Sequence, residues 1–195
     1  MMFEQLELID RKIFLSLNGF HASEADSIMY YISQSWVFLP LFLYWAYLIY
    51  VHMGVKKTVI LLLGIILLVV LTDQTSNQMK HATKRYRPSH NLEIKSKVHI
   101  VNEYRGGKYG FFSGHATNSF GIAMLLFLIF NKKTLLFRAF IFIWAFLTAY
   151  SRIYLGVHYP SDILVGVLVG LSWGFLVFQI LQYIFKKKFD EAISV

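Results

Sequence analysis

Residues 151–162 read Ser-Arg-Ile-Tyr-Leu-Gly-Val-His-Tyr-Pro-Ser-Asp and lie between two strongly apolar segments of the chain. A cation (Arg152), an imidazole (His158) and a carboxylate (Asp162) therefore occur within these twelve residues. Ionisable groups at the edge of a membrane segment are costly to keep there, and in such places they usually serve a function. The stretch predicts a polar site where two membrane helices meet.

The composition of the whole chain predicts an integral membrane protein. Hydrophobic residues make up 56% of its 195 residues, whereas soluble domains reach only about 45–50% even with glycine counted. Cysteine is absent, which excludes a disulfide framework and thiolate chemistry. The net charge of +8 indicates cytoplasmic basic loops or contacts with anionic lipids. Nucleic acid is disfavoured as a partner, because no soluble basic domain is present to hold it.

The distribution of apolar residues predicts an all-α protein, a bundle of five transmembrane helices in a single domain that covers residues 1–195. The first two apolar runs are shorter than the ~20 residues that a span prefers, so their polar flanks are expected to continue the helices. No internal repeat or second domain is evident. The expected spans lie at about residues 36–52, 58–73, 115–130, 134–151 and 161–185.

Residues 1–34 are expected to form amphipathic helices that lie at the membrane interface rather than cross it. Gly19 is a plausible end for the first helix, and Ser23 to Asp26 resemble a capping box that opens a second one. The ordinary interpretation of such helices is packing without chemistry. The first helix is too charged to span, and its apolar residues have helical spacing: Phe3, Leu6, Ile9, Ile13 and Leu17.

A second polar cluster follows the second apolar run. Its members are spaced by four, three, four and three residues, so they are expected on one face of a helix that ends before Pro88. A solvated basic face is the ordinary alternative. Residues 89–112 then form a polar loop that can be a lid, a headgroup-binding rim or a connector. The members of the cluster are Asp73, Asn77, Lys80, Lys84 and Arg87.

The third polar cluster opens the next helix. Ser113 is expected to be its N-cap, with Gly114 and His115 directly after it. The free N–H groups and the dipole at a helix start favour an anion. Ser161 is expected to cap the last span in the same way.

The distribution of lysines predicts the orientation in the membrane. The pairs 56–57 and 132–133 and the run 186–188 fall on one side if the spans alternate, and this side is expected to be cytoplasmic. All three polar clusters then lie on the outer face. The basic segment 73–112 is an exception to the charge rule, which a function that needs cations there explains.

Together these residues suit attack on a phosphate monoester or diphosphate. Lys80, Arg87 and Arg152 can neutralise the phosphate oxygens, and the Ser113 hydroxyl and the N–H groups near Gly114 can complete the cradle. This set of cations also repels a divalent metal ion, so neither a metal nor another cofactor is expected.

Two imidazoles in different settings can divide the remaining work. His158 can act as a neutral nucleophile that forms a phosphohistidine, and His115 can act first as proton donor and then as base. Asp162, four residues after His158, can accept the Nδ1 proton and orient the ring.

The three clusters resemble the signature of the type 2 phosphatidic acid phosphatase (PAP2) family, K-x6-RP, PSGH and SR-x5-H-x3-D. The first matches at Lys80 to Pro88 and the third at Ser151 to Asp162, whereas Phe112 replaces the proline of the second. The resemblance implies a metal-independent phosphatase with the residue roles given above. Without a soluble domain and with five expected spans, the chain resembles the lipid-phosphate branch of the family. Its small size and a site expected to face the cell envelope predict a protein of the bacterial inner membrane.

The residues leave the substrate open among undecaprenyl diphosphate, phosphatidylglycerol phosphate and a lipid A phosphate, at the outer leaflet. The loop cations Lys84, Arg85, Lys95, Lys97, Arg105 and Lys108 would suit a bulky polyanionic headgroup. A lipid-to-lipid phosphotransferase shares the same first step, and a non-enzymatic lipid-binding protein is the alternative of another class. The oligomeric state is also open.

Overall fold

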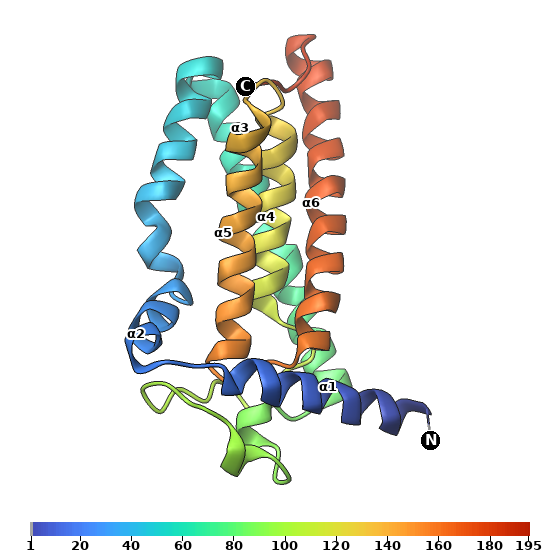
Figure 1. The fold of residues 1–195 in the computed structure, drawn as a ribbon. Helices are drawn as coiled ribbons and strands as arrows, with labels where there is room; N and C mark the ends of the chain where they lie inside the picture. Colours follow the sequence, from blue (N-terminus) through green and yellow to red (C-terminus); the bar gives the residue numbers. More distant parts are fainter. Residues whose placement is uncertain (1) are drawn as a thin grey trace.

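The computed structural model describes residues 2–195, with side chains from Glu4 onward, so the predicted apolar side chain of Phe3 lies outside the described part. Within these described residues, six α-helices are joined by loops and three short 3-10 turns. Helices α3 to α6 stand side by side as a bundle, and α1 lies across one end of it (Figure 1). The elements are α1 (Met2–Gly19), α2 (Ser23–Ile32), η1 (Ser35–Phe38), α3 (Leu39–Thr83), η2 (Pro88–His90), η3 (Lys95–Lys97), α4 (Gly114–Ile129), α5 (Leu135–Tyr154) and α6 (Pro160–Phe189).

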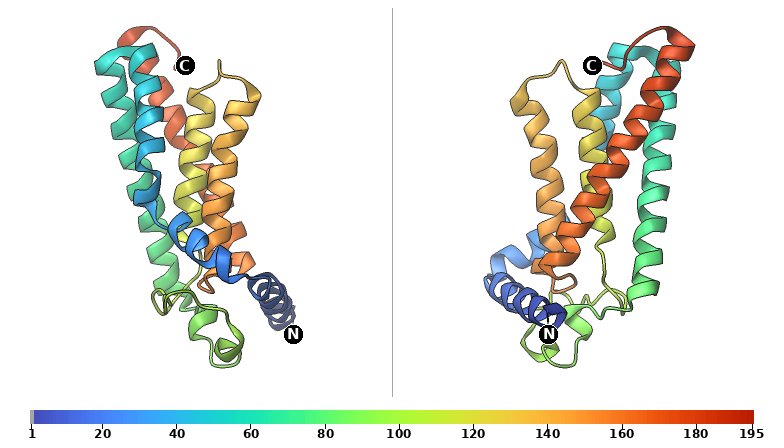
Figure 2. Two further views of the ribbon diagram at one scale, coloured as in Figure 1. Left: turned by 60° about the vertical axis from the view of Figure 1, so that its left-hand side comes forward. Right: turned by 90° about the vertical axis from the view of Figure 1, so that its right-hand side faces the viewer.

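Helix α3 is interrupted at Gly54, where the backbone is non-helical with φ 72° and ψ 173°. A positive φ is accessible to glycine without steric cost. The chain reverses here, so the part before Gly54 and the part after it form two limbs that run in opposite directions (Figures 1 and 2). These limbs match the first two apolar runs of the sequence.

The fold is that of a helical membrane protein. Within residues 2–195, three helical stretches are long and apolar enough to cross a membrane, namely Ser35–Thr83, Leu135–Tyr154 and Pro160–Phe189. Helix α4 is apolar but shorter. An all-helical membrane fold is therefore shown, whereas the count of five crossings stays a prediction.

The end of α3 differs from the sequence-based expectation. The helix stops at Thr83, Lys84 has a left-handed conformation (φ 50°), and Arg87 is extended (φ −64°, ψ 156°). Pro88 disfavours a helical conformation for the residue before it, and the Arg87 N–H donates to the Lys108 carbonyl at 3.1 Å. The prediction that Lys84 and Arg87 extend one helical face was therefore wrong.

Two predicted helix caps were also wrong. Helix α2 has Ala22 as its N-cap, without a side-chain hydrogen bond, so Ser23 already lies inside the helix. Helix α6 starts with Pro160, a residue preorganised for the first helical position, so Tyr159 and not Ser161 is its N-cap. The cap at Ser113 is confirmed, since its side chain accepts the Ala116 N–H at 3.4 Å.

Glycines bring α6 and α4 into close contact along their length. A Cβ atom at Gly170 would lie 2.4 Å from the Thr117 carbonyl oxygen, and one at Gly174 would lie 2.4 Å from the Gly121 carbonyl oxygen. Small residues allow this approach of two helix backbones in a membrane. Because α4 opens and α6 begins at the same end of the bundle, this contact fixes the distance between their first turns.

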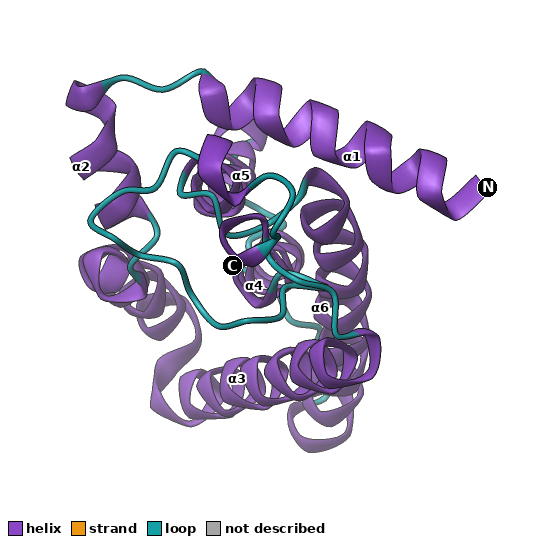
Figure 3. Ribbon diagram, turned by 90° about the horizontal axis from the view of Figure 1, so that it is seen from below, coloured by secondary structure: helices purple, strands orange, loops and turns teal. Residues whose placement is uncertain are grey.

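Helix α1 buries two polar residues and one aromatic residue against the bundle. Asp10, Phe14 and Asn18 are buried, whereas Leu6 is 56% and Ile9 53% exposed. Apolar side chains of the first part of α1 thus point away from the protein, whereas Phe14 packs against the bundle. This is the arrangement expected of a helix at a membrane interface. Figure 3 shows α1 lying across the end of the bundle.

Candidate active site

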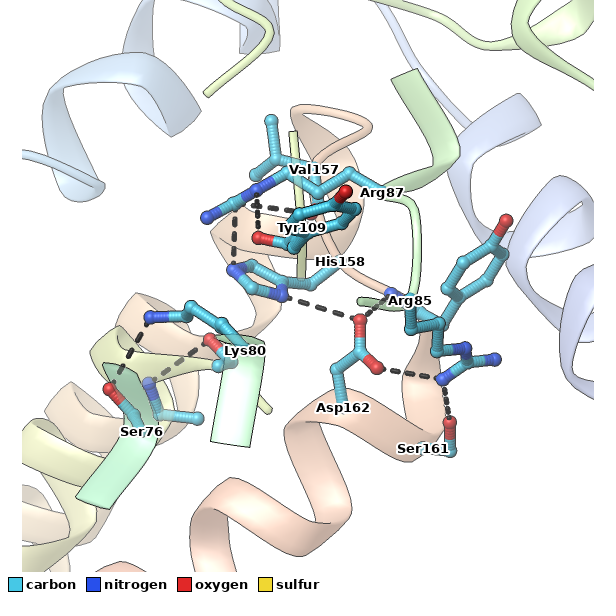
Figure 4. A network of polar contacts seen from close by, with 12 residues as sticks. Ser76, Lys80, Arg85, Arg87, Tyr109, Val157, His158, Ser161 and Asp162 are labelled. Atoms are coloured by element: carbon cyan, nitrogen blue, oxygen red, sulfur yellow. Dashed lines mark hydrogen bonds and ion pairs between the residues drawn. The ribbon is translucent and has the colours of Figure 1, made fainter. Parts of the chain in front are cut away.

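The site lies where α3 ends, α4 begins, α5 ends and α6 begins, beneath the loop of residues 84–113 (Figures 3 and 4). Arg152 is 1%, His158 2% and Asp162 0% exposed. The stretch 151–162 contributes these three residues from the end of α5 to the start of α6. The predicted residues of the three polar clusters thus gather at one end of the bundle.

His158 is held on both ring nitrogens. Arg87 Nη1 donates to Nε2 at 2.9 Å, and Nδ1 lies 3.4 Å from Asp162 Oδ2. Because a guanidinium can only donate, Nε2 must be unprotonated, which places the ring proton on Nδ1, facing Asp162. Figure 4 shows the imidazole between these two partners.

The surroundings of His158 keep the ring neutral. Burial and the positive charges of Arg87, Arg152 and Lys80 lower its pKa well below the ordinary value of 6.5. A neutral imidazole with a lone pair on Nε2 is the form in which histidine is a nucleophile. The geometry is therefore suited to attack from Nε2, once Arg87 has moved to another acceptor.

Asp162 receives hydrogen bonds on both carboxylate oxygens. Oδ2 accepts the Tyr159 N–H at 3.0 Å and faces His158, and Oδ1 accepts from Arg85 Nη1 at 2.7 Å. The sequence had suggested Arg85 only as one of the loop cations for a headgroup. Its contact with Asp162 was missed, since the loop that carries it gives no periodic pattern to read.

Arg87 enters the site from the extended segment after α3. Its Nε donates to the Tyr109 carbonyl at 3.1 Å, and Nη1 also approaches the Val157 carbonyl at 3.2 Å. Gly106, with φ +63°, leaves room for the guanidinium, since a Cβ there would lie 3.1 Å from Nη1. Burial and the nearby charge of Arg152 lower the pKa of Arg87.

Arg152 is the most deeply buried cation of the site. Its Nη2 donates to the Tyr104 hydroxyl at 2.8 Å, whereas Nε and Nη1 are buried with no hydrogen-bond partner in the described part of the chain. Buried donors nearly always have an acceptor, and a guanidinium favours oxyanions. Two free donors at this position indicate a site for an anion. Tyr104, in the loop of residues 89–112, was not predicted.

Lys80 reaches the start of α4. Its Nζ lies 3.3 Å from Ser76 Oγ and 3.4 Å from Asn77 Oδ1, and a Cβ at Gly114 would lie 3.5 Å from Nζ. The ammonium therefore lies beside the first residue of α4. His115, the next residue, lies close enough for the charges of Arg152, His158, Arg87 and Lys80 to act on it.

The loop of residues 89–112 is packed rather than free. Ile94 is 7% and Val101 4% exposed, and the Ser89 N–H donates to the Gly156 carbonyl at 3.1 Å. The loop connects α3 to α4, and its use as a lid or as a headgroup-binding rim stays a prediction. It also contributes Tyr104 as a polar contact of Arg152.

The fold and the site define a helical, multi-pass membrane protein with basic side chains gathered around a neutral histidine. The chain belongs to the PAP2 superfamily, whose family model matches residues 57–186. The resemblance stated from the sequence motifs is thereby confirmed.

Individual relatives cover most of the chain. A lipid A 4'-phosphatase of Porphyromonas gingivalis is 35% identical over 178 residues, 90% of this chain and 74% of the relative. A lipid A 4'-phosphatase of Bacteroides thetaiotaomicron is 35% identical over 181 residues, 92% of this chain and 80% of the relative. The structure of a PAP2 type phosphatidylglycerolphosphate phosphatase from Bacillus subtilis has a TM-score of 0.70 at 22% identity, covering 95% of this chain and 89% of that one. The last likeness shows the fold alone.

Proposed function

We propose that this protein is a membrane lipid phosphatase that removes a phosphate group from lipid A. The observation that carries the proposal is the pair of free, buried donors on Arg152 beside the Arg87–His158 contact. An anion between the two guanidinium groups would satisfy these donors and would place an electrophilic phosphorus near Nε2. The two relatives at 35% identity, both lipid A 4'-phosphatases, support lipid A and its 4'-phosphate as the substrate.

In the first step, the phosphate oxygens take the hydrogen bonds of Arg87 and Arg152, with Lys80, Ser113 and the N–H of Gly114 as further ligands. Arg87 thereby leaves Nε2 free. The Nε2 lone pair then attacks phosphorus in line with the bond to the lipid oxygen. This bond breaks as the N–P bond forms, and the lipid oxygen takes a proton.

His115 supplies that proton, and Asp162 compensates the positive charge that develops on the phosphorylated ring of His158. In the second step His115 takes a proton from water, whose oxygen attacks phosphorus. The N–P bond breaks, inorganic phosphate leaves and His158 is neutral again. The sum is hydrolysis of one phosphate ester by one water molecule.

We propose that the reaction needs no metal ion or other cofactor. Lys80, Arg87 and Arg152 supply the positive charge that a divalent metal ion provides in other phosphatases. The phosphatase activity is therefore expected to be unchanged in the presence of EDTA.

A lipid-to-lipid phosphotransferase would share the phosphohistidine and differ only in the acceptor of the second step. Undecaprenyl diphosphate and phosphatidylglycerol phosphate also present a phosphate at a membrane surface. The names of the relatives favour lipid A over both. A non-enzymatic lipid-binding protein would have no use for a nucleophile geometry at His158.

We further propose that five segments cross the membrane, counting both limbs of α3, and that residues 1–34 lie at the outer interface. Lysine-bearing turns at the opposite end support a cytoplasmic placement of that end, where Lys57 pairs with Glu191 and the Lys132 N–H donates to the Val195 carbonyl. A cysteine placed at Lys97 should then react with an impermeant reagent from the periplasmic side. Labelling from the cytoplasmic side alone would reverse the orientation.

The decisive experiment is a phosphate-release assay of the purified protein with EDTA present. Doubly phosphorylated lipid A, undecaprenyl diphosphate and phosphatidylglycerol phosphate are the substrates, and mass spectrometry identifies which phosphate is lost. We expect release from the 4' position of lipid A. Added diacylglycerol or undecaprenyl phosphate would become phosphorylated if the protein were a transferase. If none of the three lipids loses phosphate, the proposed function is wrong.

A further inference from the structure

Helix α1 holds the stretch 151–162 through two buried polar side chains. Near its end, Asn18 Nδ2 donates to the carbonyls of Ile153 (3.1 Å) and Tyr154 (2.8 Å). The two anchors on α1, Asn18 and Asp10, are eight positions apart, or about 12 Å by helical rise. Both anchors lie on the face of α1 that is turned toward the bundle.

Asp10 contacts the other end of the stretch. Its Oδ1 accepts the Ser161 N–H at 3.0 Å, and its Oδ2 accepts the Ser161 hydroxyl. Asp10 is 7% exposed. A buried carboxylate is strongly disfavoured unless it is paired, and its partner is Arg85, whose Nη2 lies 2.6 Å from Oδ2.

Arg85 joins this carboxylate to the one that faces His158. The guanidinium uses Nη2 for Asp10 and Nη1 for Asp162 Oδ1 and the Ser161 hydroxyl, each of these last two at 2.7 Å. Its Cζ lies over the Tyr159 ring, 4.3 Å from the ring centre, which is a further contact that holds the group. Figure 4 shows Arg85 on the side of Asp162 that faces away from His158.

The contact to Arg85 determines the rotation of the Asp162 carboxylate. Oδ2 faces His158 and accepts the Tyr159 N–H, so the other oxygen, Oδ1, depends on Arg85 for its hydrogen bond. Without Arg85 a fully buried oxygen would be left unsatisfied. The carboxylate could then turn toward another donor and release Nδ1 of His158.

We propose that Asp10 and Arg85 are positioning residues for the reaction at His158: the α1 carboxylate fixes the guanidinium, and the guanidinium holds Asp162 in the rotation that orients the imidazole. This inference rests on the proposed function. It gives the interfacial helix a role in the chemistry, although its apolar face suggests only an anchor at the membrane.

The test compares Asp10→Asn, Arg85→Gln and the double variant in steady-state kinetics with lipid A. A misplacement of about 1 Å at a reacting group can lower the rate about a hundredfold. We expect Arg85→Gln to lower kcat by about tenfold to a hundredfold, with KM changed less than about twofold. Asp10→Asn should lower kcat less, and the double variant should match Arg85→Gln, since Asp10 acts through Arg85.

Arg11→Gln is the matched control on the same helix. It removes ion pairs with Glu7 and Glu93 that do not reach Asp162, and its kcat should equal that of the wild type. Thermal midpoints are measured for every variant. If Arg85→Gln does not fold, Arg85→Lys, which keeps the charge but not the fork, should show a partial loss of kcat.

Three results would overturn the positioning role. These are a wild-type kcat in Asp10→Asn, additive losses in the double variant, or a rise in KM at constant kcat in Arg85→Gln. The last would mean that Arg85 binds the headgroup instead. An active wild type with any of these results leaves the proposed function intact. A wild type that releases phosphate from no lipid overturns the proposed function and the positioning role together.

Discussion

The two ends of the helical bundle are both basic, but they keep their charges in opposite ways. At the site end Arg152 is 1% and Arg87 9% exposed, and each donates to neighbouring oxygens. At the other end Lys56, Lys132 and the run 186–188 are exposed. Exposed lysines are solvated and contribute little to stability, whereas buried guanidinium groups require fixed partners.

This difference shows that the number of charges does not locate a site in such a protein. Lys132 follows the apolar helix α4 and Arg152 lies in the last turn of the apolar helix α5, so a cation at the end of an apolar helix occurs at both ends. Arg152 differs from Lys132 because it is buried and because its Nε and Nη1 have no hydrogen-bond partner in the described part of the chain. Substitutions at the two ends should therefore differ in their effect on activity as the ends differ in burial.

The largest difference is expected from His158→Ala. Removal of the nucleophile should lower phosphate release from lipid A by at least about a thousandfold. At the opposite end Lys132→Gln should leave the rate within about twofold, because this side chain is exposed and far from the chemistry. Both rates are measured by phosphate release, with circular dichroism as the control for folding. A fully active His158→Ala would exclude the phosphohistidine.

A smaller but still large loss is expected from Arg152→Lys. The ammonium keeps the charge but cannot offer two parallel N–H groups to one phosphate, so kcat/KM should fall by about a hundredfold. The opposite exchange at the other end, Lys187→Arg, should change nothing measurable. The same kinetic assay checks both variants. Equal activity of Arg152→Lys and wild type would mean that Arg152 serves only as a point charge.

The sequence predicted the membrane class and the gathering of the polar clusters at one end, because apolar runs and motif spacing are local signals. It misplaced Arg87 on a helix, since the pairing of this segment with Lys108 is a contact between loop strands that spacing does not reveal. The contacts of Arg85, Tyr104 and Asp10 were missed for a related reason. Each acts through a partner far away in the chain, and no periodic pattern records such contacts.

The contact between α4 and α6 lies between the two ends of the bundle. A substitution in this contact should affect the stability of the fold rather than the reaction. In Gly170→Ala the new Cβ would lie 2.4 Å from a backbone carbonyl oxygen, so the helices must separate. Overpacking of this kind costs about 1–3 kcal/mol. We expect a lower thermal midpoint in detergent, with a near-normal kcat for the folded fraction.

Alanine substitutions at two other glycines should lower the thermal midpoint less than Gly170→Ala does. In Gly64→Ala the Cβ would meet the end of the Leu181 side chain, which can move, so the loss should be smaller. Gly107→Ala meets nothing within 4 Å and should leave the midpoint unchanged. If Gly170→Ala melts like Gly107→Ala, the close contact between α4 and α6 does not limit stability.

The smallest expected effect is the contribution of His158 to the pH dependence of native stability. Its pKa is lowered because burial and the charges of Arg87, Arg152 and Lys80 disfavour the imidazolium. The ordinary pKa of a histidine is about 6.5. Below that pH, His158 binds a proton in the unfolded chain but not in the native site. Native stability should therefore fall as pH decreases from about 6.5 toward the lowered pKa.

In the native protein the ring of His158 should stay neutral over the same range. The measurement is histidine NMR between pH 8 and 5.5, with the His158 resonance assigned as the one that His158→Gln lacks. We expect this resonance not to shift across the whole range. A His158 resonance that shifts with a midpoint near about 6.5 would mean that burial and the neighbouring cations do not lower the pKa of this imidazole. The neutral nucleophile would then need another cause than burial among arginines.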